Sequence, residues 1–292
     1  MRVLLHSGGP LGPVGRAALA EFVGPRRRIA FVTAASLHDE TVYFERVRAA
    51  LEPAPPEGAG LDLVHLRWND EPLATLADVE ALFMGGGNTY ALLQRLRAAG
   101  VLEAIRARVA AGMPYMGASA GSNVAGPTIL TTNDWNVVGL DQFDALGLVG
   151  FNINPHYRAI DPAMAPFSET RDDRIREYHV VNGNPVLGLE EGAWVVAGDG
   201  AVTAHGTARV KLFRAVGRPL GDDAGHRQGG PAGQRDARPV RRQADHAELP
   251  RQAGERPRVP PSCQVRGLRR HYRTGPAADR GLGGFLREDV QG

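Results

Sequence analysis

Residues 113–126 read MPYMGASAGSNVAG, and this stretch decides how the rest of the chain is interpreted. An apolar run leads into Gly117-Ala118-Ser119-Ala120-Gly121, and further small residues follow. This order predicts a strand, a sharp turn and the start of a helix, with Ser119 at the apex. A G-x-S-x-G turn suits a nucleophile, because small residues tolerate the strained backbone and the serine Oγ stays exposed. The alternative is an ordinary small-residue turn in a chain rich in glycine and alanine.

Strand-like apolar runs alternate with helical patterns ahead of this stretch. Expected strands lie at residues 2–6, 28–33, 61–66 and 80–84, and expected helices at residues 14–23, 39–51, 90–98 and 102–111. Sustained alternation predicts an α/β fold, in which a mostly parallel sheet is flanked by helices on both faces. Ligands bind beyond the carboxyl ends of such strands. The glycine run at residues 85–87 and Ser119 both fall at that edge, so we expect them to be neighbours.

The pattern changes after residue 126. Extended segments are expected at residues 127–132 and 149–153, and a charged helix at residues 171–178. Short strands with glycine turns, at residues 186–189, 193–197, 201–204 and 210–213, predict an antiparallel edge. Residues 1–227 therefore form the predicted domain. Residues 228–292 are rich in arginine, proline and glycine, and we expect this tail to be disordered, because it has too few apolar residues to offset the entropy of ordering.

The amino-acid composition limits the classes of protein to which this chain can belong. The chain has 292 residues, 43% of them hydrophobic, and a formal net charge of +2. The tail carries 13 arginines against 7 acidic residues, which leaves the predicted domain mildly acidic and does not suggest a nucleic-acid partner. A single cysteine, Cys263, excludes an intramolecular disulfide and a metal site built from cysteines. No apolar run is long enough for a membrane span, so we expect a cytoplasmic protein without a membrane partner.

A serine nucleophile needs a base to accept its proton and a third group to orient that base. His156, in Asn154-Pro155-His156-Tyr157, follows an expected strand and lies among polar residues, and the alternative is a structural loop histidine. Asp134 lies beside Trp135 shortly after the serine, where an Asx-turn is the alternative. Glu191 lies at the end of another expected strand, where it could equally belong to a solvated turn.

Five segments together resemble the peptidase E family, the cytoplasmic aspartyl dipeptidases. They are FMGGGNTYALL (83–93), YMGASAGSNVAGPTILTTNDW (115–135), FNINPHY (151–157), SETRDDRIRE (168–177) and GLEEGAW (188–194). Their order and spacing match those of the family, and the resemblance covers roughly residues 1–227. It implies a serine hydrolase on a fold similar to the class I glutamine amidotransferases, which is flavodoxin-like, and a small peptide as substrate.

The resemblance also implies roles for individual residues. Ser119 is the expected nucleophile, His156 the general base and Asp134 the acidic partner of the histidine. Gly87, or its neighbour Gly86, and Ala120 are expected to donate N–H groups to the oxyanion.

Three further residues are expected to contact the substrate. Arg171 looks like the family's cation for the aspartate carboxylate, since a guanidinium binds a carboxylate through two hydrogen bonds. A surface ion pair within its helix is the alternative. Glu191 is expected either to bind the substrate's α-amine or to replace Asp134, and Asn88 to line the site. The resemblance implies no metal or cofactor, and a monomer or homodimer.

Three departures from the family bear on specificity. Ala118 stands where the family often has tryptophan, Ser122 where alanine is common, and Trp135-Asn136 where we associate Met-Pro with the dipeptidases. Two alternatives to an Asp-Xaa dipeptidase therefore stay open. One is a related serine hydrolase with another substrate, such as a β-aspartyl or cyanophycin-type peptide. The other is a catalytically silent binding protein on the same fold.

Overall fold

The computed structural model describes residues 1–8, 13–26, 28–51, 62–67, 71–159, 169–217 and 247–248. These all belong to one compact unit, Met1–Gln252. The predicted disorder of residues 228–292 concerns residues outside the described ranges, apart from the short strand β11 (Ala247–Glu248). The domain boundary at residue 227 stays a prediction.

The larger of two sheets confirms the expected α/β fold. Its seven strands, in spatial order, are β3 (Asp62–Leu66), β2 (Arg28–Val32), β4 (Ala81–Met84), β5 (Tyr115–Ala118), β1 (Arg2–His6), β8 (Ala193–Gly198) and β9 (Ala201–Gly206). The first five are parallel, and β8 and β9 add antiparallel strands at one side. Because β1 pairs with both β5 and β8, the ends of three strands meet beside Ser119.

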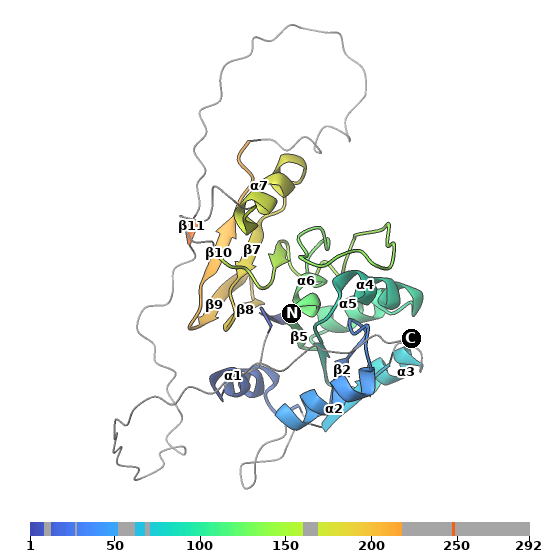
Figure 1. Ribbon diagram of the computed structural model, residues 1–292. Coiled ribbons are helices and arrows are strands. Elements are labelled where there is room, and N and C mark those ends of the chain that lie inside the picture. The colour runs from blue at the N-terminus through green and yellow to red at the C-terminus, as the bar shows by residue number, and fades with distance from the viewer. Residues whose placement is uncertain are drawn as a thin grey trace, which may run out of the picture. The chain divides into compact units, whose positions relative to one another are not determined.

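Two layers of helices cover this sheet (Figure 1). The helices α1 (Pro13–Val23) and α2 (Glu40–Leu51) pack with one apolar cluster of strand residues, and α3 (Pro72–Ala77), α4 (Thr89–Ala98) and α5 (Leu102–Ala110) pack with the other. Within β1 the side chain of Leu4 joins the first cluster, and those of Val3 and Leu5 join the second. This alternation follows from the period of two in a strand and buries both faces. No helix in the described ranges is long and apolar enough to cross a membrane.

The remaining strands correct one expectation. Residues 186–189 and 210–213 do not extend the larger sheet: β7 (Val186–Leu189) and β10 (Val210–Phe213) form a smaller sheet with β6 (Asn152–Asn154) and β11. The strand β6 runs parallel to β7, while β10 is antiparallel to it. The two sheets are connected through the short loop between β7 and β8. The smaller sheet therefore brings the end of β6 to the edge of the larger one that carries Ser119.

Two other expectations differ from the structure. Residues 127–132 form no strand but a turn-rich loop, with one isolated bridge between Thr128 and Asp144. The helix α3 was not expected, because it is short and begins directly at Pro72. The charged helix was expected and is α7 (Arg171–Val181), capped by Thr170 and Asp173, each of which bonds the backbone of the other.

Candidate active site

Ser119 occupies a strained turn between β5 and the short helix α6 (Ala120–Asn123). Its backbone angles are φ 53° and ψ −112°, a conformation that a residue with a side chain rarely adopts. The N–H of Ser119 donates to the carbonyl oxygen of His6 at 3.1 Å, and its own carbonyl accepts from the N–H of Ser122 at 2.9 Å. The turn is therefore held by hydrogen bonds on both sides, with the hydroxyl left at the edge of the sheet.

Both glycines of the G-x-S-x-G pattern are required by close backbone contacts. A Cβ atom on Gly117 would lie 2.5 Å from the carbonyl oxygen of Gly121. A Cβ atom on Gly121 would lie 2.1 Å from the carbonyl oxygen of Met84, at the end of β4. The pattern therefore marks a place where helix α6 starts against the neighbouring strand, and the alternative of an ordinary turn does not account for it.

His156 is brought to the serine by the end of β6. Its Nε2 lies 2.7 Å from the Oγ of Ser119. The backbone of His156 has φ 54°, and its N–H donates to the Oγ of Ser7 at 2.9 Å. Gly8 lies against the imidazole: a Cβ atom there would lie 2.4 Å from Cε1. The ring is thus fixed by contacts with the loop after β1.

The carboxylate on the other side of His156 belongs to Glu191. Its Oε1 forms a hydrogen bond with Nδ1 of the imidazole. Glu191 lies in the loop between β7 and β8, which is held in place because Glu190 pairs with Arg209 at 2.9 Å. Ser119, His156 and Glu191 therefore form one continuous hydrogen-bonded chain, with the histidine and glutamate side chains 42% and 56% exposed.

Asp134 does not occupy the place that the sequence led us to expect. Its Oδ2 accepts hydrogen bonds from the N–H of Thr89 at 2.7 Å, the hydroxyl of Thr89 at 2.6 Å and that of Thr132 at 3.1 Å. Thr89 is the first residue of α4, so the carboxylate lies at a helix N-terminus, where its charge is favourable. The contact with His156 that we expected from Asp134 is made by Glu191 instead.

The glycine run lies beside Ser119, as expected. A Cβ atom on Gly86 would lie 3.1 Å from the Cβ of Ser119. The N–H of Gly86 donates to the hydroxyl of Tyr43 at 3.0 Å, so it is already engaged. Gly87, with φ 138°, and Ala120, the first residue of α6, have backbone N–H groups without a hydrogen bond to any described residue. Of the two glycines, Gly87 is therefore the better candidate donor to an oxyanion.

Arg171 and Asn88, two of the predicted substrate contacts, differ in how many hydrogen-bond partners they already have. Arg171, the first residue of α7, is half-buried and forms no hydrogen bond or ion pair with the described part of the chain. Burial, and then the nearby Arg174, lower the pKa of its guanidinium. Asn88 caps α4 by accepting from the N–H of Ala91, and its side-chain amide also donates to the carbonyl oxygen of Trp135. Arg171 is thus available to an anion, whereas Asn88 already has two partners.

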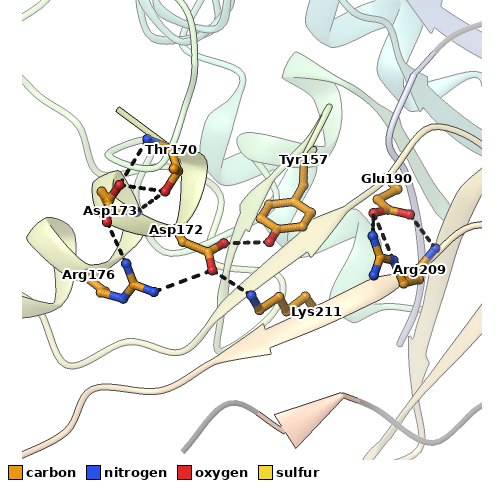
Figure 2. A network of polar contacts seen from close by, with 8 residues as sticks. All are labelled: Tyr157, Thr170, Asp172, Asp173, Arg176, Glu190, Arg209 and Lys211. Atoms are coloured by element: carbon orange, nitrogen blue, oxygen red, sulfur yellow. Dashed lines mark hydrogen bonds and ion pairs between the residues drawn. The ribbon is translucent and has the colours of Figure 1, made fainter. Parts of the chain in front are cut away.

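A polar network joins Asp172, at the start of α7, to Tyr157, after the end of β6 (Figure 2). Tyr157, next to His156, donates its hydroxyl to Asp172 at 2.6 Å, and Asp172 follows Arg171. Lys211, the one lysine in the sequence, donates to the same carboxylate at 2.7 Å. Burial alone would raise the pKa of Asp172, but the bonds from Lys211 and Tyr157 outweigh it and hold this pKa below its usual value. The network fixes the start of α7 relative to the end of β6.

A serine hydroxyl bonded to an imidazole, which is bonded in turn to a carboxylate, can carry out acyl transfer. On a strained turn after a parallel strand, beside N–H groups that no described residue engages, this arrangement is that of a serine hydrolase. In the described ranges no three histidine, cysteine, aspartate or glutamate side chains gather as a metal ion would need.

Comparisons with known proteins identify the family. The model of peptidase family S51 matches residues 4–204. The chain is 45% identical to a peptidase E of Streptomyces coelicolor, over 66% of this chain and 77% of the relative. It is 42% identical to a probable alpha-aspartyl dipeptidase of Drosophila melanogaster, over 62% of this chain and 74% of the relative.

A solved structure agrees with these relatives. A putative peptidase E protein from Listeria monocytogenes superposes with a TM-score of 0.56 at 26% identity, and covers 71% of this chain and 98% of that one. The chain belongs to peptidase family S51, a family of serine peptidases.

Sequence reasoning missed three residues that hold the site. Ser7 and Gly8 contact His156, and Tyr43 binds the glycine run. A signal existed for the first two, because a polar loop after the first strand of a parallel sheet falls at the catalytic edge. Tyr43 gave no such signal, since it is one aromatic residue on the buried side of a helix.

We expect the substitution Asp172→Asn to lower the free energy of unfolding at pH 7 by about 2 kcal/mol, because charge-assisted hydrogen bonds are lost. Since the pKa of Asp172 in the folded state lies below its ordinary value of 3.8, the stabilisation is complete above that pH. It is lost as the pH falls through the lower, folded-state pKa. Urea unfolding at pH 7 and at about pH 3 should therefore show the difference from the wild type shrinking in acid.

The control for this experiment is Glu103→Gln, which removes an exposed ion pair with Arg106. Such surface pairs contribute about 0–1 kcal/mol, so little change is expected at either pH. A difference for Asp172→Asn that stays constant from pH 7 into acid would contradict the assigned role of its charge.

Proposed function

We propose that this protein is a dipeptidase that cleaves the peptide bond after an N-terminal aspartate, through an acyl-enzyme on Ser119. The observation that carries the proposal is the 2.7 Å contact between the Oγ of Ser119 and Nε2 of His156 in a chain of family S51. The substrate class is taken from the resemblance to the aspartyl dipeptidases and from the name of the Drosophila melanogaster relative.

Acylation begins with the proton of the serine hydroxyl. His156 accepts it at Nε2 while Oγ attacks the carbonyl carbon, and Glu191 stabilises the imidazolium that forms. The carbonyl oxygen becomes an oxyanion, which the N–H groups of Gly87 and Ala120 stabilise. His156 then donates its proton to the leaving amine, the C–N bond breaks, and the second amino acid departs.

Deacylation uses the same groups in reverse. A water molecule enters, loses a proton to Nε2 of His156, and attacks the ester carbonyl on Ser119. The second oxyanion forms at the same N–H groups. Return of the proton to Oγ releases aspartate and restores the enzyme. The exposure of His156 and Glu191 allows the water to reach the imidazole.

Recognition of the aspartate side chain is assigned to Arg171. Its guanidinium is half-buried and without a partner in the described residues, and a partly desolvated cation binds a carboxylate more strongly than one in water. The network through Asp172 and Tyr157 holds α7 against the segment that carries His156. We further propose the cytoplasm as the setting, with a monomer or homodimer as the working unit.

The first test is hydrolysis of Asp-Ala, Glu-Ala, Ala-Ala and β-Asp-Ala by the wild type and by Ser119→Ala. We expect Asp-Ala to be cleaved fastest and the variant to lose at least about three powers of ten in kcat, because the nucleophile is gone. Preference for β-Asp-Ala would favour the β-aspartyl alternative. Absence of cleavage together with failure of a fluorophosphonate probe to label Ser119 would favour a silent binding protein.

A second test separates the two candidate acids. Glu191→Gln should lower kcat by about two to four powers of ten, because the imidazole loses the charge that orients it and stabilises its protonated form. Asp134→Asn should keep kcat within about tenfold and lower the unfolding free energy by about 1 kcal/mol, as expected for a helix N-terminus. Steady-state kinetics and urea unfolding of both variants decide the matter. The reverse pattern would return the catalytic role to Asp134.

A third test concerns Arg171. Arg171→Met should lower kcat/KM for Asp-Ala by about 10- to 100-fold, mostly through KM, because the substrate carboxylate loses its partner. The matched control is Arg174→Met on the same helix, whose guanidinium pairs with Glu169 instead. Equal losses in the two variants would argue against a specific contact at Arg171.

A further inference from the structure

An apolar cavity of about 560 Å³ lies between the larger sheet and the helices α1 and α2. This volume is within the range of about 300–1,000 Å³ that is usual for small-molecule sites, and far above the voids of a packed core. Its walls come from strands and helices alike and are mostly apolar. They include Leu4, Leu19, Phe31, Val47, Phe83 and Met116.

One end of this cavity reaches the catalytic edge. Its lining includes Ala118, the residue directly before Ser119, together with His6 and Trp194. The sheet register places these side by side, because His6 pairs with Ala118 on β5 and with Trp194 on β8. Alanine has a small side chain, so the space extends to the backbone that carries the nucleophile. Tyr43, which binds the N–H of Gly86, lies in the same lining.

His6 adds a polar group to this end of the cavity. Its side chain is only 6% exposed, and its ring lies close enough to Glu191 and His156 for their charges to act on its pKa. Burial lowers the pKa of His6, which favours a neutral ring that can donate or accept a hydrogen bond.

The chemistry of the lining selects one part of the substrate. The aspartate side chain already has a proposed partner in Arg171, so this cavity is left for the second residue of the dipeptide. The second residue does fit, because its side chain can be apolar while its free carboxylate needs a cation. Arg46 supplies positive charge to the same lining. Arg46 is on α2, with its guanidinium 5.6 Å from the ring centroid of Tyr43.

We propose that this cavity is the subsite for the second residue of the dipeptide, and that it selects large apolar side chains such as leucine, phenylalanine and tryptophan. The proposal rests on the proposed function, because it places the leaving amino acid of that reaction. It names a substrate class, Asp-Xaa with an apolar Xaa.

The test compares kcat/KM for Asp-Ala, Asp-Asn, Asp-Leu and Asp-Phe. Leucine and asparagine are similar in size and differ in polarity, so Asp-Leu should exceed Asp-Asn by about 10-fold or more, and Asp-Phe should exceed Asp-Ala by a similar factor. Equal values across the four dipeptides would overturn the subsite and leave the dipeptidase standing. Cleavage of none of them would overturn the proposed function and the subsite with it.

A matched pair of variants tests the place of the subsite. Val47→Phe adds bulk inside the cavity, whereas Val42→Phe makes the same change on the same helix at a side chain that is 64% exposed. The ratio of Asp-Phe to Asp-Ala should fall at least about fivefold in Val47→Phe and stay unchanged in Val42→Phe. If Val47→Phe fails to fold by circular dichroism, Ala18→Leu fills the cavity from α1. An unchanged ratio in the folded filling variant would overturn the proposal.

Discussion

The left-handed turn at Ser119 is the constraint on which the rest of the site depends. It exists because helix α6 begins so close to β4 that Gly121 nearly touches the carbonyl oxygen of Met84. That approach leaves the chain too little room for a relaxed turn, and Ser119 takes φ 53°. The consequence is a hydroxyl at the sheet edge and, one residue later, an N–H at the start of a helix that has no partner among the residues the structure describes. The proposed nucleophile and one proposed donor to the oxyanion thus both depend on one backbone contact.

His156 is also held by a single residue, which joins segments far apart in the sequence. The hydroxyl of Ser7, fully buried, accepts from the N–H of His156 and donates to the carbonyl oxygen of Leu189. Leu189 ends β7, and Glu191 follows two residues later. One serine therefore sets the histidine segment and the glutamate segment against the end of β1. These hydrogen bonds position the backbone of both segments, so the imidazole of His156 and the carboxylate of Glu191 are brought together although both side chains are exposed.

The contrast between a turn formed by neighbouring residues and a contact between distant segments explains what the sequence could predict. Ser119, the parallel sheet and the glycine run carry local signals: small residues at a turn, apolar runs of strand length, and a polar edge after each strand. No local signal identifies the carboxylate that bonds His156. Glu191 reaches the imidazole only because β6 pairs with β7 and a short loop leads from β7 to β8. Asp134 was the expected partner of His156 because it follows the serine closely in the sequence. In the structure its carboxylate instead accepts a hydrogen bond from the first turn of α4. Long-range register places Glu191, and not Asp134, against His156.

The same turn also divides the space around the nucleophile into two unlike environments. Towards α7 the chain offers a half-buried guanidinium, and the charged network of Asp172, Tyr157 and Lys211 that fixes its helix. Towards α1 and α2 it offers apolar walls that extend to Ala118. An aspartate side chain is stabilised beside the guanidinium on the first side, whereas an apolar side chain is stabilised among the walls on the second, where Arg46 remains for the free carboxylate of the second residue. A dipeptide with unlike ends would therefore have a single orientation of low energy, and that orientation presents its one peptide bond to Ser119.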